Sequence, residues 1–219
     1  MTAVVLVDDH AMMRAGIRSI LEHEETITVV GEANDGREAI ELTARVVPDV
    51  VLIDVGMPGL NGIEATRKIL AEDPKVSVIA LSMHSDERYL HGMLEAGARG
   101  YLLKTCGARE LILAIETVQR GQIYITSELT HLLVDRRYPR AGQAQHGGSR
   151  LSEELTPRER EVLQLIAEGQ TSKQISIRLG TAVKTIESHR TNLIQKLDLH
   201  SIADLTKYAL REGLIQLSD

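Results

Sequence analysis

The sequence predicts an α/β domain with a doubly wound, five-stranded parallel sheet, followed by a small all-α domain. Over the first 120 residues, short runs rich in β-branched residues alternate with longer amphipathic segments. After residue 151 only segments of helical period remain. The chain has 219 residues, 43% of them hydrophobic, which is enough for one large domain or two small ones.

Two of the expected strands are uninterrupted apolar runs, Val50 to Ile53 and Val76 to Leu81. Such runs are typical of central parallel strands covered by helices on both faces. The expected strands are Ala3–Val7, Ile27–Gly31, Val50–Asp54, Val76–Ser82 and Arg99–Leu103. The expected helices between them cover residues 11–22, 35–46, 61–72, 86–96 and 107–119. Five such β/α units predict an open, doubly wound parallel sheet.

A linker is expected between the two domains, which gives boundaries of 1–121, 122–150 and 151–219. Residues 139–149 are polar and rich in glycine, with too little apolar surface to offset the entropy of ordering. Within this linker, Ser127 to Tyr138 is compatible with a short helix. We therefore expect limited proteolysis to cut first at 139–149.

The second domain begins with a helix-start signal. Thr156 is the expected N-cap, Pro157 the first helical residue, and Glu159 completes a capping box. Helices are expected over 157–168, 172–179, 183–197 and 202–212. The second and third, joined at Gly180, have the form of a helix-turn-helix.

The charge is unevenly distributed. The formal net charge is −6, and most of the acid lies in the first 120 residues. Within Thr171 to Leu197, five basic residues face only Glu187, a pattern compatible with DNA binding. The aromatic content of 2% argues against stacking platforms for single-stranded nucleic acid.

The composition also excludes several kinds of protein. A single cysteine, Cys106, excludes an intramolecular disulfide and a cysteine-rich zinc site, and we interpret it as a small packing residue. No apolar run approaches the roughly 18 residues of a membrane span. The first residues lack the features of a signal peptide. We expect a cytoplasmic protein that does not interact with membranes.

Polar side chains are expected to gather at the carboxyl edge of the sheet, where open α/β sheets bind ligands. Asp8 and Asp9 end the first strand, Asp54 ends the third, Ser82 ends the fourth, and Lys104 follows the fifth. If the first and third strands are neighbours, three carboxylates converge, and their repulsion calls for a hard cation such as Mg²⁺. Asp54 is then the expected nucleophile toward a phosphoryl group.

The same segments resemble the receiver domain of two-component response regulators. They are Val7-Asp8-Asp9-His10, Asp54-Val55-Gly56-Met57-Pro58-Gly59-Leu60-Asn61-Gly62, Ala80-Leu81-Ser82 and Gly100-Tyr101-Leu102-Leu103-Lys104, and the resemblance spans residues 3–119. It implies that Asp54 accepts phosphate from a sensor histidine kinase.

The resemblance also implies roles for the surrounding residues. Asp9, Asp54 and the Gly56 carbonyl would hold Mg²⁺, with Asp8 acting mainly through water. Lys104 would pair with the phosphoryl oxygens, and Ser82 would move toward them as Tyr101 rotates inward. Tyr101 is equally compatible with an ordinary strand residue. The sequence departs from the family at Thr105, where receivers commonly have proline.

The second domain resembles the LuxR-type helix-turn-helix, and the whole chain resembles the NarL/FixJ class of response regulators. The resemblance rests on Leu155 to Leu163, Gly169 to Ile175, Val183 to Arg190 and Lys196-Leu197. It implies contacts with double-stranded DNA by Thr171, Ser172, Lys173, Lys184, Thr185, Glu187, Ser188, His189, Arg190 and Thr191. The stripe of Val183, Ile186, Leu193, Ile194 and Leu197 would face the core.

Where the family usually caps the recognition helix with Ser, this chain has Ala182, so either Thr181 caps the helix or the cap is weaker. The family counterpart of the last helix is a dimer contact, which implies roles for Ile202, Leu205 and Ala209. Pairing on phosphorylation would double the DNA contacts. RNA polymerase is a further candidate partner.

Two alternatives stay open. A phosphatase of the haloacid dehalogenase type would also use a strand-end Asp, but it needs a second Asp at the position of Gly56. A regulator that binds DNA without phosphorylation ranks below the switched form, because every residue of the acidic site is present. The expected function is that of a transcriptional regulator, not of an enzyme.

Overall fold

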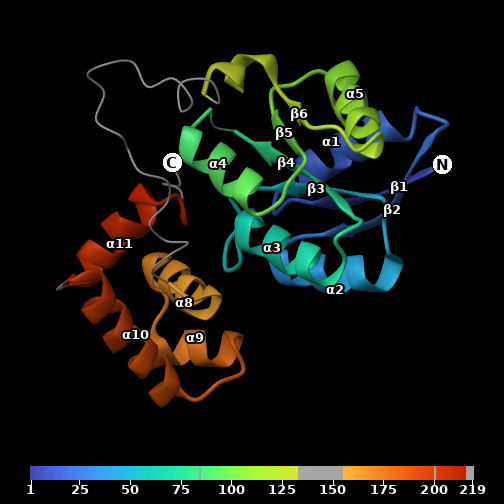
Figure 1. The fold of residues 1–219 in the computed structure, drawn as a ribbon. Coiled ribbons are helices and arrows are strands. Elements are labelled where there is room, and N and C mark those ends of the chain that lie inside the picture. The colour runs from blue at the N-terminus through green and yellow to red at the C-terminus, as the bar shows by residue number, and fades with distance from the viewer. Residues whose placement is uncertain (84, 133–154, 200, 216–219) are drawn as a thin grey trace. The chain divides into compact units, whose positions relative to one another are not determined.

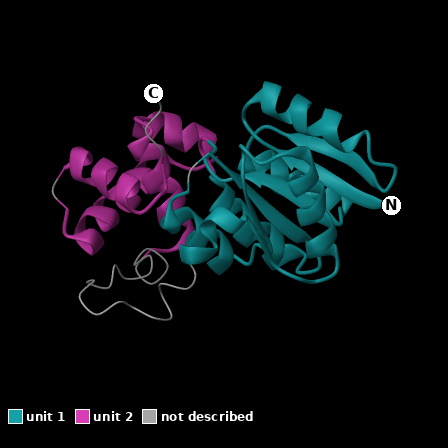
Figure 2. Ribbon diagram, turned by 90° about the horizontal axis from the view of Figure 1, so that it is seen from above, with its two compact units in different colours: residues 1–57, 61–147 teal, residues 58–60, 148–219 magenta. Residues whose placement is uncertain are grey.

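The computed structural model describes residues 1–83, 85–132, 155–199 and 201–215. These residues form two compact units, each with its own hydrophobic core (Figure 2). The expected proteolysis site at 139–149 lies outside the described residues. In the part of the chain that is described, no helix is both long and apolar enough to cross a membrane.

The first unit is built on a six-stranded sheet in the order β2-β1-β3-β4-β5-β6. The strands are β1 (Thr2–Val7), β2 (Ile27–Ala33), β3 (Val50–Asp54), β4 (Ser77–Ser82), β5 (Gly100–Leu103) and β6 (Tyr124–Ile125). All neighbouring strands are parallel. Every residue of β3 and β4 is buried, as the continuous apolar runs predict.

Helices cover both faces of this sheet (Figure 1). They are α1 (Ala11–Leu21), α2 (Gly36–Val46), α3 (Gly62–Glu72), α4 (Glu87–Glu95) and α5 (Ala108–Gln119). The core on one face joins α1 and α5 to the central strands; it includes Ile17, Leu21, Leu52, Leu111 and Ile115. α2, α3 and α4 lie on the opposite face (Figure 1).

The five predicted strands and five predicted helices are all present, with ends shifted by no more than two residues. The first unit continues past the boundary expected at residue 121, because β6 pairs with β5 and Thr126 and Leu129 are buried. A 3₁₀ turn, η1 (Ser127–Leu129), follows. β6 has only two residues, so it carries no periodic signal that sequence reasoning could detect.

The second unit contains α8 (Pro157–Ala167), α9 (Ser172–Arg178), α10 (Val183–Leu197) and α11 (Ile202–Arg211). The predicted capping box at Thr156 and Glu159 is confirmed, and a second one forms between Thr171 and Gln174. Apolar side chains from all four helices form one core, including Val162, Ile175, Leu193 and Leu205.

The start of α10 differs from the expectation in one respect. Ala182 is its N-cap, and no side chain caps the helix, so Thr181 does not take this role. Val183 is 43% exposed, and its assignment to the core stripe is wrong. In the first turn of α10 only Ile186 is buried, although Val183 lies one helical turn before it on the same face, because the neighbouring helices do not cover the start of α10.

Candidate functional site

Three carboxylates meet at the carboxyl edge of the sheet because β1 and β3 are neighbours. Val7 pairs with Ile53, so Asp8 and Asp9 directly after β1 lie beside Asp54 at the end of β3. Ligand atoms of Asp8, Asp9, His10 and Asp54 all lie within 4.8 Å of one another. The convergence expected from the sequence is therefore present.

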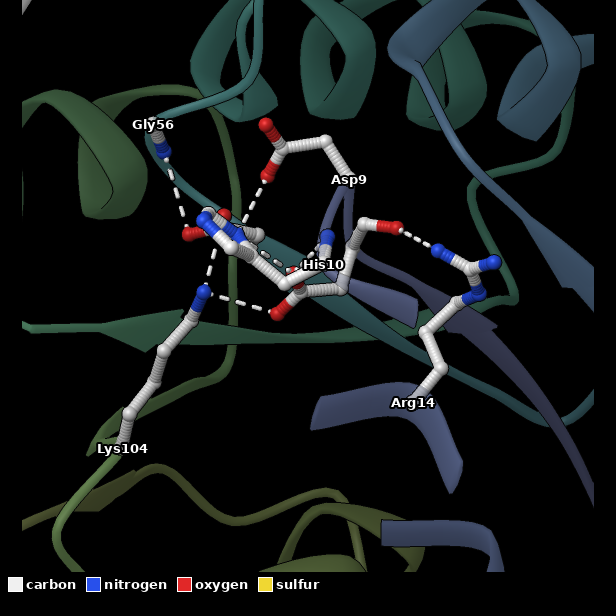
Figure 3. A network of polar contacts seen from close by, with 7 residues as sticks. Asp9, His10, Arg14, Gly56 and Lys104 are labelled. Carbon is white, nitrogen blue, oxygen red and sulfur yellow. Dashed lines mark hydrogen bonds and ion pairs between the residues drawn. The ribbon is translucent and has the colours of Figure 1, made fainter. Parts of the chain in front are cut away.

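Lys104 neutralises part of this charge (Figure 3). Its Nζ lies 2.7 Å from Asp8 Oδ2 and 2.8 Å from Asp54 Oδ2, and the Lys104 side chain is only 4% exposed. Burial opposes the charged ammonium, but the carboxylates of Asp54 and Asp8 outweigh burial and raise the pKa of Lys104. A fixed positive charge therefore faces the oxygens of Asp54.

Asp54 is almost completely buried, and burial raises the pKa of its carboxyl group despite the opposing charge of Lys104. The amide of Gly56 donates to Asp54 Oδ1 at 3.2 Å, which favours the ionised form. A desolvated carboxylate held between an amide and an ammonium is well suited to act as a nucleophile.

The start of α3 packs against the backbone of Asp54. The Asn61 side chain caps this helix by accepting from the amide of Glu64. A Cβ added at Gly62 would lie 2.2 Å from the Asp54 carbonyl oxygen and 2.9 Å from Val55 Cα. Glycine at position 62 is thus needed for the close approach that holds the Asp54 backbone in place.

Arg14 holds the loop that follows β1, a role that was not predicted from the sequence. The Arg14 guanidinium on α1 donates to the Asp8 carbonyl and pairs with Glu32 of β2 at 3.2 Å. Arg14 follows His10 by one helical turn, so it lies on the face of α1 next to the acidic loop. A basic residue at this spacing after two aspartates is the signal that could have identified it.

Ser82 and Tyr101 are in contact with each other inside the protein. Both are buried, at 1% and 0% exposure, and the two hydroxyl groups are hydrogen-bonded. Burial raises the pKa of the Tyr101 phenol well above its usual range, so this hydroxyl stays protonated. In this structure Tyr101 points into the protein and lies next to Ser82, the residue whose movement the resemblance couples to it.

The residues present fit a divalent cation. Three carboxylates carry more negative charge than one lysine neutralises, and they offer the hard oxygen ligands that Mg²⁺ prefers. Asp9 is the accessible member, with 28% of its side chain exposed. The cluster is thus consistent with a divalent metal site formed mainly by the loop after β1 and the end of β3.

Cys106 packs against the core shared by α1 and α5. Burial and the nearby Glu110 carboxylate raise the pKa of the Cys106 thiol, which disfavours the reactive thiolate. Its packing and its raised pKa agree with a packing role for Cys106.

Among the described residues no peptide bond is cis, so the Lys104–Thr105 bond, where the sequence departs from the family, is trans.

The residues expected to contact DNA lie mainly on exposed surface. Seven of them are exposed: Thr171, Lys173, Lys184, Thr185, Glu187, Ser188 and Thr191. The other three, Ser172, His189 and Arg190, are half-buried. The Thr171 hydroxyl serves the capping box of α9, and the Ser188 and Thr191 hydroxyls donate to carbonyls of their own helix.

Lys196 and two of the expected dimer residues make contacts within their own unit. Lys196 Nζ pairs with Glu159 Oε2 at 2.8 Å, so it belongs to the α8–α10 contact and its charge is neutralised. Leu205 and Ala209 are at 0% exposure in the core of the unit, so neither side chain is accessible to a second subunit in this structure. Ile202, at 47% exposure, is the one of the three that is accessible.

Comparison with known proteins identifies the family. Residues 4–116 match the response regulator receiver domain, and residues 153–209 match the bacterial regulatory proteins of the luxR family. The chain is a response regulator. The oxygen regulatory protein NreC of Staphylococcus carnosus is 39% identical to it over 213 residues, which cover 97% of this chain and 98% of NreC.

Solved structures support the same family. A LuxR-family two-component response regulator from Aurantimonas sp. has 34% identity and a TM-score of 0.60, covering 63% of this chain and 98% of its own. RcsB of Salmonella typhimurium has 28% identity and a TM-score of 0.59, covering 95% and 98%. An RcsB–DNA complex matches with 28% identity and a TM-score of 0.58, covering 96% and 98%. This response regulator therefore combines a receiver with a LuxR-type helix-turn-helix, and the family does not consist of enzymes.

Proposed function

We propose that Asp54 of this response regulator accepts a phosphoryl group from a sensor histidine kinase, and that the modification promotes dimerisation and binding to double-stranded DNA. The observation that carries the proposal is the contact of the Lys104 ammonium with both Asp8 and Asp54 at 2.7 and 2.8 Å. Such a cation lies where the charge of a phosphoryl group on Asp54 would develop.

In the proposed transfer, an Asp54 carboxylate oxygen attacks the phosphorus of a phosphohistidine. An O–P bond forms as the N–P bond to the histidine breaks, and the imidazole leaves with its electron pair. Asp8, Asp9, Asp54 and the Gly56 carbonyl would hold Mg²⁺, which supplies electrostatic stabilisation of the phosphoryl oxygens. Lys104 would neutralise a further phosphoryl oxygen.

Ser82 and Tyr101 would connect the site to the rest of the receiver. A phosphoryl oxygen on Asp54 offers a strong acceptor, which would draw the Ser82 hydroxyl toward it. This movement would compete with the existing hydrogen bond between Ser82 and Tyr101. A change in that hydrogen bond would alter the local packing around Tyr101 and, through it, a surface used for dimerisation.

The exposed side chains of α10 supply the proposed DNA-reading surface. Lys184 and Arg190 would contact phosphates, while Glu187 and Ser188 would face base edges. Thr171, Ser172 and Lys173 at the start of α9 would anchor the supporting helix on the backbone. The remaining contacts would come from Thr185, His189 and Thr191.

Two homologous structures support the proposal that two subunits bind DNA together. One is an RcsB–DNA complex and the other contains two RcsB dimers bound to two parallel DNAs. Pairing two subunits doubles the phosphate contacts and thus the affinity that one small domain can reach. We place the protein in the cytoplasm, with its kinase and RNA polymerase as further partners.

Mass spectrometry after incubation with acetyl phosphate and Mg²⁺ tests the phosphoacceptor. One phosphoryl group should be added to the wild type and to Asp49→Asn, which changes an aspartate at the opposite end of β3. Asp54→Asn should take up none while keeping the wild-type circular dichroism spectrum. Labelling that persists in Asp54→Asn would refute the assignment.

A further inference from the structure

We propose that the imidazole of His10 is an additional ligand at the metal site of the receiver, which adapts this site to a borderline divalent transition-metal ion such as Co²⁺ or Ni²⁺. The proposal rests on the proposed function, since it assumes the metal site formed by the aspartates. It adds a nitrogen ligand and a class of metal ion that the carboxylates alone do not indicate.

The distances around His10 fit ligands on neighbouring positions of one ion. His10 Nδ1 lies 2.8 Å from Asp9 Oδ1 and 3.3 Å from Asp8 Oδ1. Two ligands at right angles around an octahedral ion, with bonds of about 2.1 Å, are separated by about 3.0 Å. The Asp54 oxygen also lies within 4.8 Å of the other three ligand atoms, so all four are near enough to serve one ion.

The backbone fixes the root of His10, and its ring lies against the carboxylates of Asp8 and Asp9. The His10 amide donates to Asp8 Oδ1 at 2.8 Å, which holds the residue against the acidic cluster (Figure 3). His10 is the N-cap of α1, but its side chain makes no capping hydrogen bond, and 70% of this side chain is exposed. The ring can therefore adjust toward an ion without disturbing the core.

The chemistry of the ligand set determines the metal class. Mg²⁺ is a hard ion that prefers oxygen ligands and gains little from an imidazole. Borderline ions of the first transition row bind imidazole well, so the nitrogen of His10 should strengthen their binding selectively. If the ring instead only donates a hydrogen bond to Asp9, its removal should affect both classes of ion alike.

Isothermal titration of the full-length protein with CoCl₂ and MgCl₂, at about pH 8, separates these cases. His10→Ala should weaken Co²⁺ binding about tenfold or more and change Mg²⁺ binding by less than about twofold. His23→Ala is the matched control, because His23 follows the opposite end of α1. This control should bind both ions like the wild type, and Mg²⁺ should displace Co²⁺ from the shared site.

Proton NMR of the Co²⁺-loaded protein identifies the ligand directly. The wild type and His23→Ala should show hyperfine-shifted resonances of a coordinated imidazole ring, and His10→Ala should lack them. Equal losses of Co²⁺ and Mg²⁺ affinity in His10→Ala, or shifted ring resonances that persist in it, would overturn the role of His10 alone. Failure of Asp54→Asn to weaken either ion would instead contradict the metal site of the proposed function.

Discussion

The phosphoacceptor site and the exposed surface of α10 use charge in opposite ways. At the site, Lys104, Asp8 and Asp54 are nearly inaccessible to water, and the Lys104 ammonium lies within 3 Å of an oxygen of each carboxylate. On α10, Lys184 and Glu187 are exposed to solvent. Charges interact several times more strongly when buried than in water. Single changes at the site should therefore have large local effects, whereas changes on α10 should have small effects that depend on salt.

The largest effect is expected from Lys104→Met. Without the ammonium, the buried carboxylates of Asp8 and Asp54 lose their counterion, and breaking such a buried pair costs about 3 kcal/mol. Urea unfolding in EDTA measures this cost without a competing cation. Phosphotransfer from acetyl phosphate should fall at least about 100-fold, because positive charge near the phosphoryl oxygens is lost. Wild-type stability in EDTA would contradict the importance of the pairs.

The pH dependence sharpens this comparison. Burial raises the pKa of Asp54, so the folded state binds a proton more tightly than the unfolded state does. Loss of the Lys104 charge raises that pKa further. The stability of Lys104→Met should therefore increase as pH falls, while its phosphotransfer profile should shift to higher pH, because the nucleophile must be ionised. An unshifted profile would argue against Asp54 as the titrating nucleophile.

A smaller effect is expected from Gly62→Ala. The new methyl group would lie 2.2 Å from the Asp54 carbonyl oxygen, and relieving such overpacking typically costs about 1–3 kcal/mol. Phosphorylation should slow because Asp54 is displaced. Gly16→Ala is the matched control: its Cβ meets no atom within 4 Å, and alanine inside α1 should stabilise it by about 0.5–1 kcal/mol. Thermal unfolding of the two variants should therefore shift in opposite directions.

On α10, Lys184→Ala should weaken binding to every duplex by about threefold to tenfold and reduce the salt dependence by about one counterion per bound subunit. Fluorescence anisotropy over a range of salt concentrations measures both quantities. Lys207→Ala, which removes an exposed lysine from α11, is the control and should leave both unchanged. A salt dependence that is the same in Lys184→Ala and wild type would remove Lys184 from the interface.

The smallest effect is expected from Lys196→Gln. Burial opposes ionisation of Glu159, but Lys196 and Thr156 outweigh it and lower the pKa of this carboxyl group. The resulting stability is present above the unfolded pKa of Glu, about 4.3, and is lost as pH falls through the lower folded value. Since the Lys196 side chain is 43% exposed, the variant should lose only about 0.5 kcal/mol at neutral pH. Urea unfolding should show this difference vanish in acid.

Local patterns were sufficient to predict most of the elements. The apolar run of β3 requires burial on both faces, and Thr156 with Glu159 satisfies the free amides at the start of α8, so each signal is complete within a few residues. The clustering of Asp8 and Asp54 needed one further assumption, that the first and third strands are neighbours.

The sequence by itself determined the order of strands and helices along the chain, the capping box at Thr156 and the identity of the acidic residues, because these depend on period and local hydrogen bonding. Only the tertiary structure decided that Arg14 contacts the Asp8 carbonyl, that a two-residue strand extends the sheet, and that Leu205 is buried while Val183 is exposed. A helical stripe shows which residues can be buried together, but which of them the neighbouring helices cover depends on packing between elements distant in the chain.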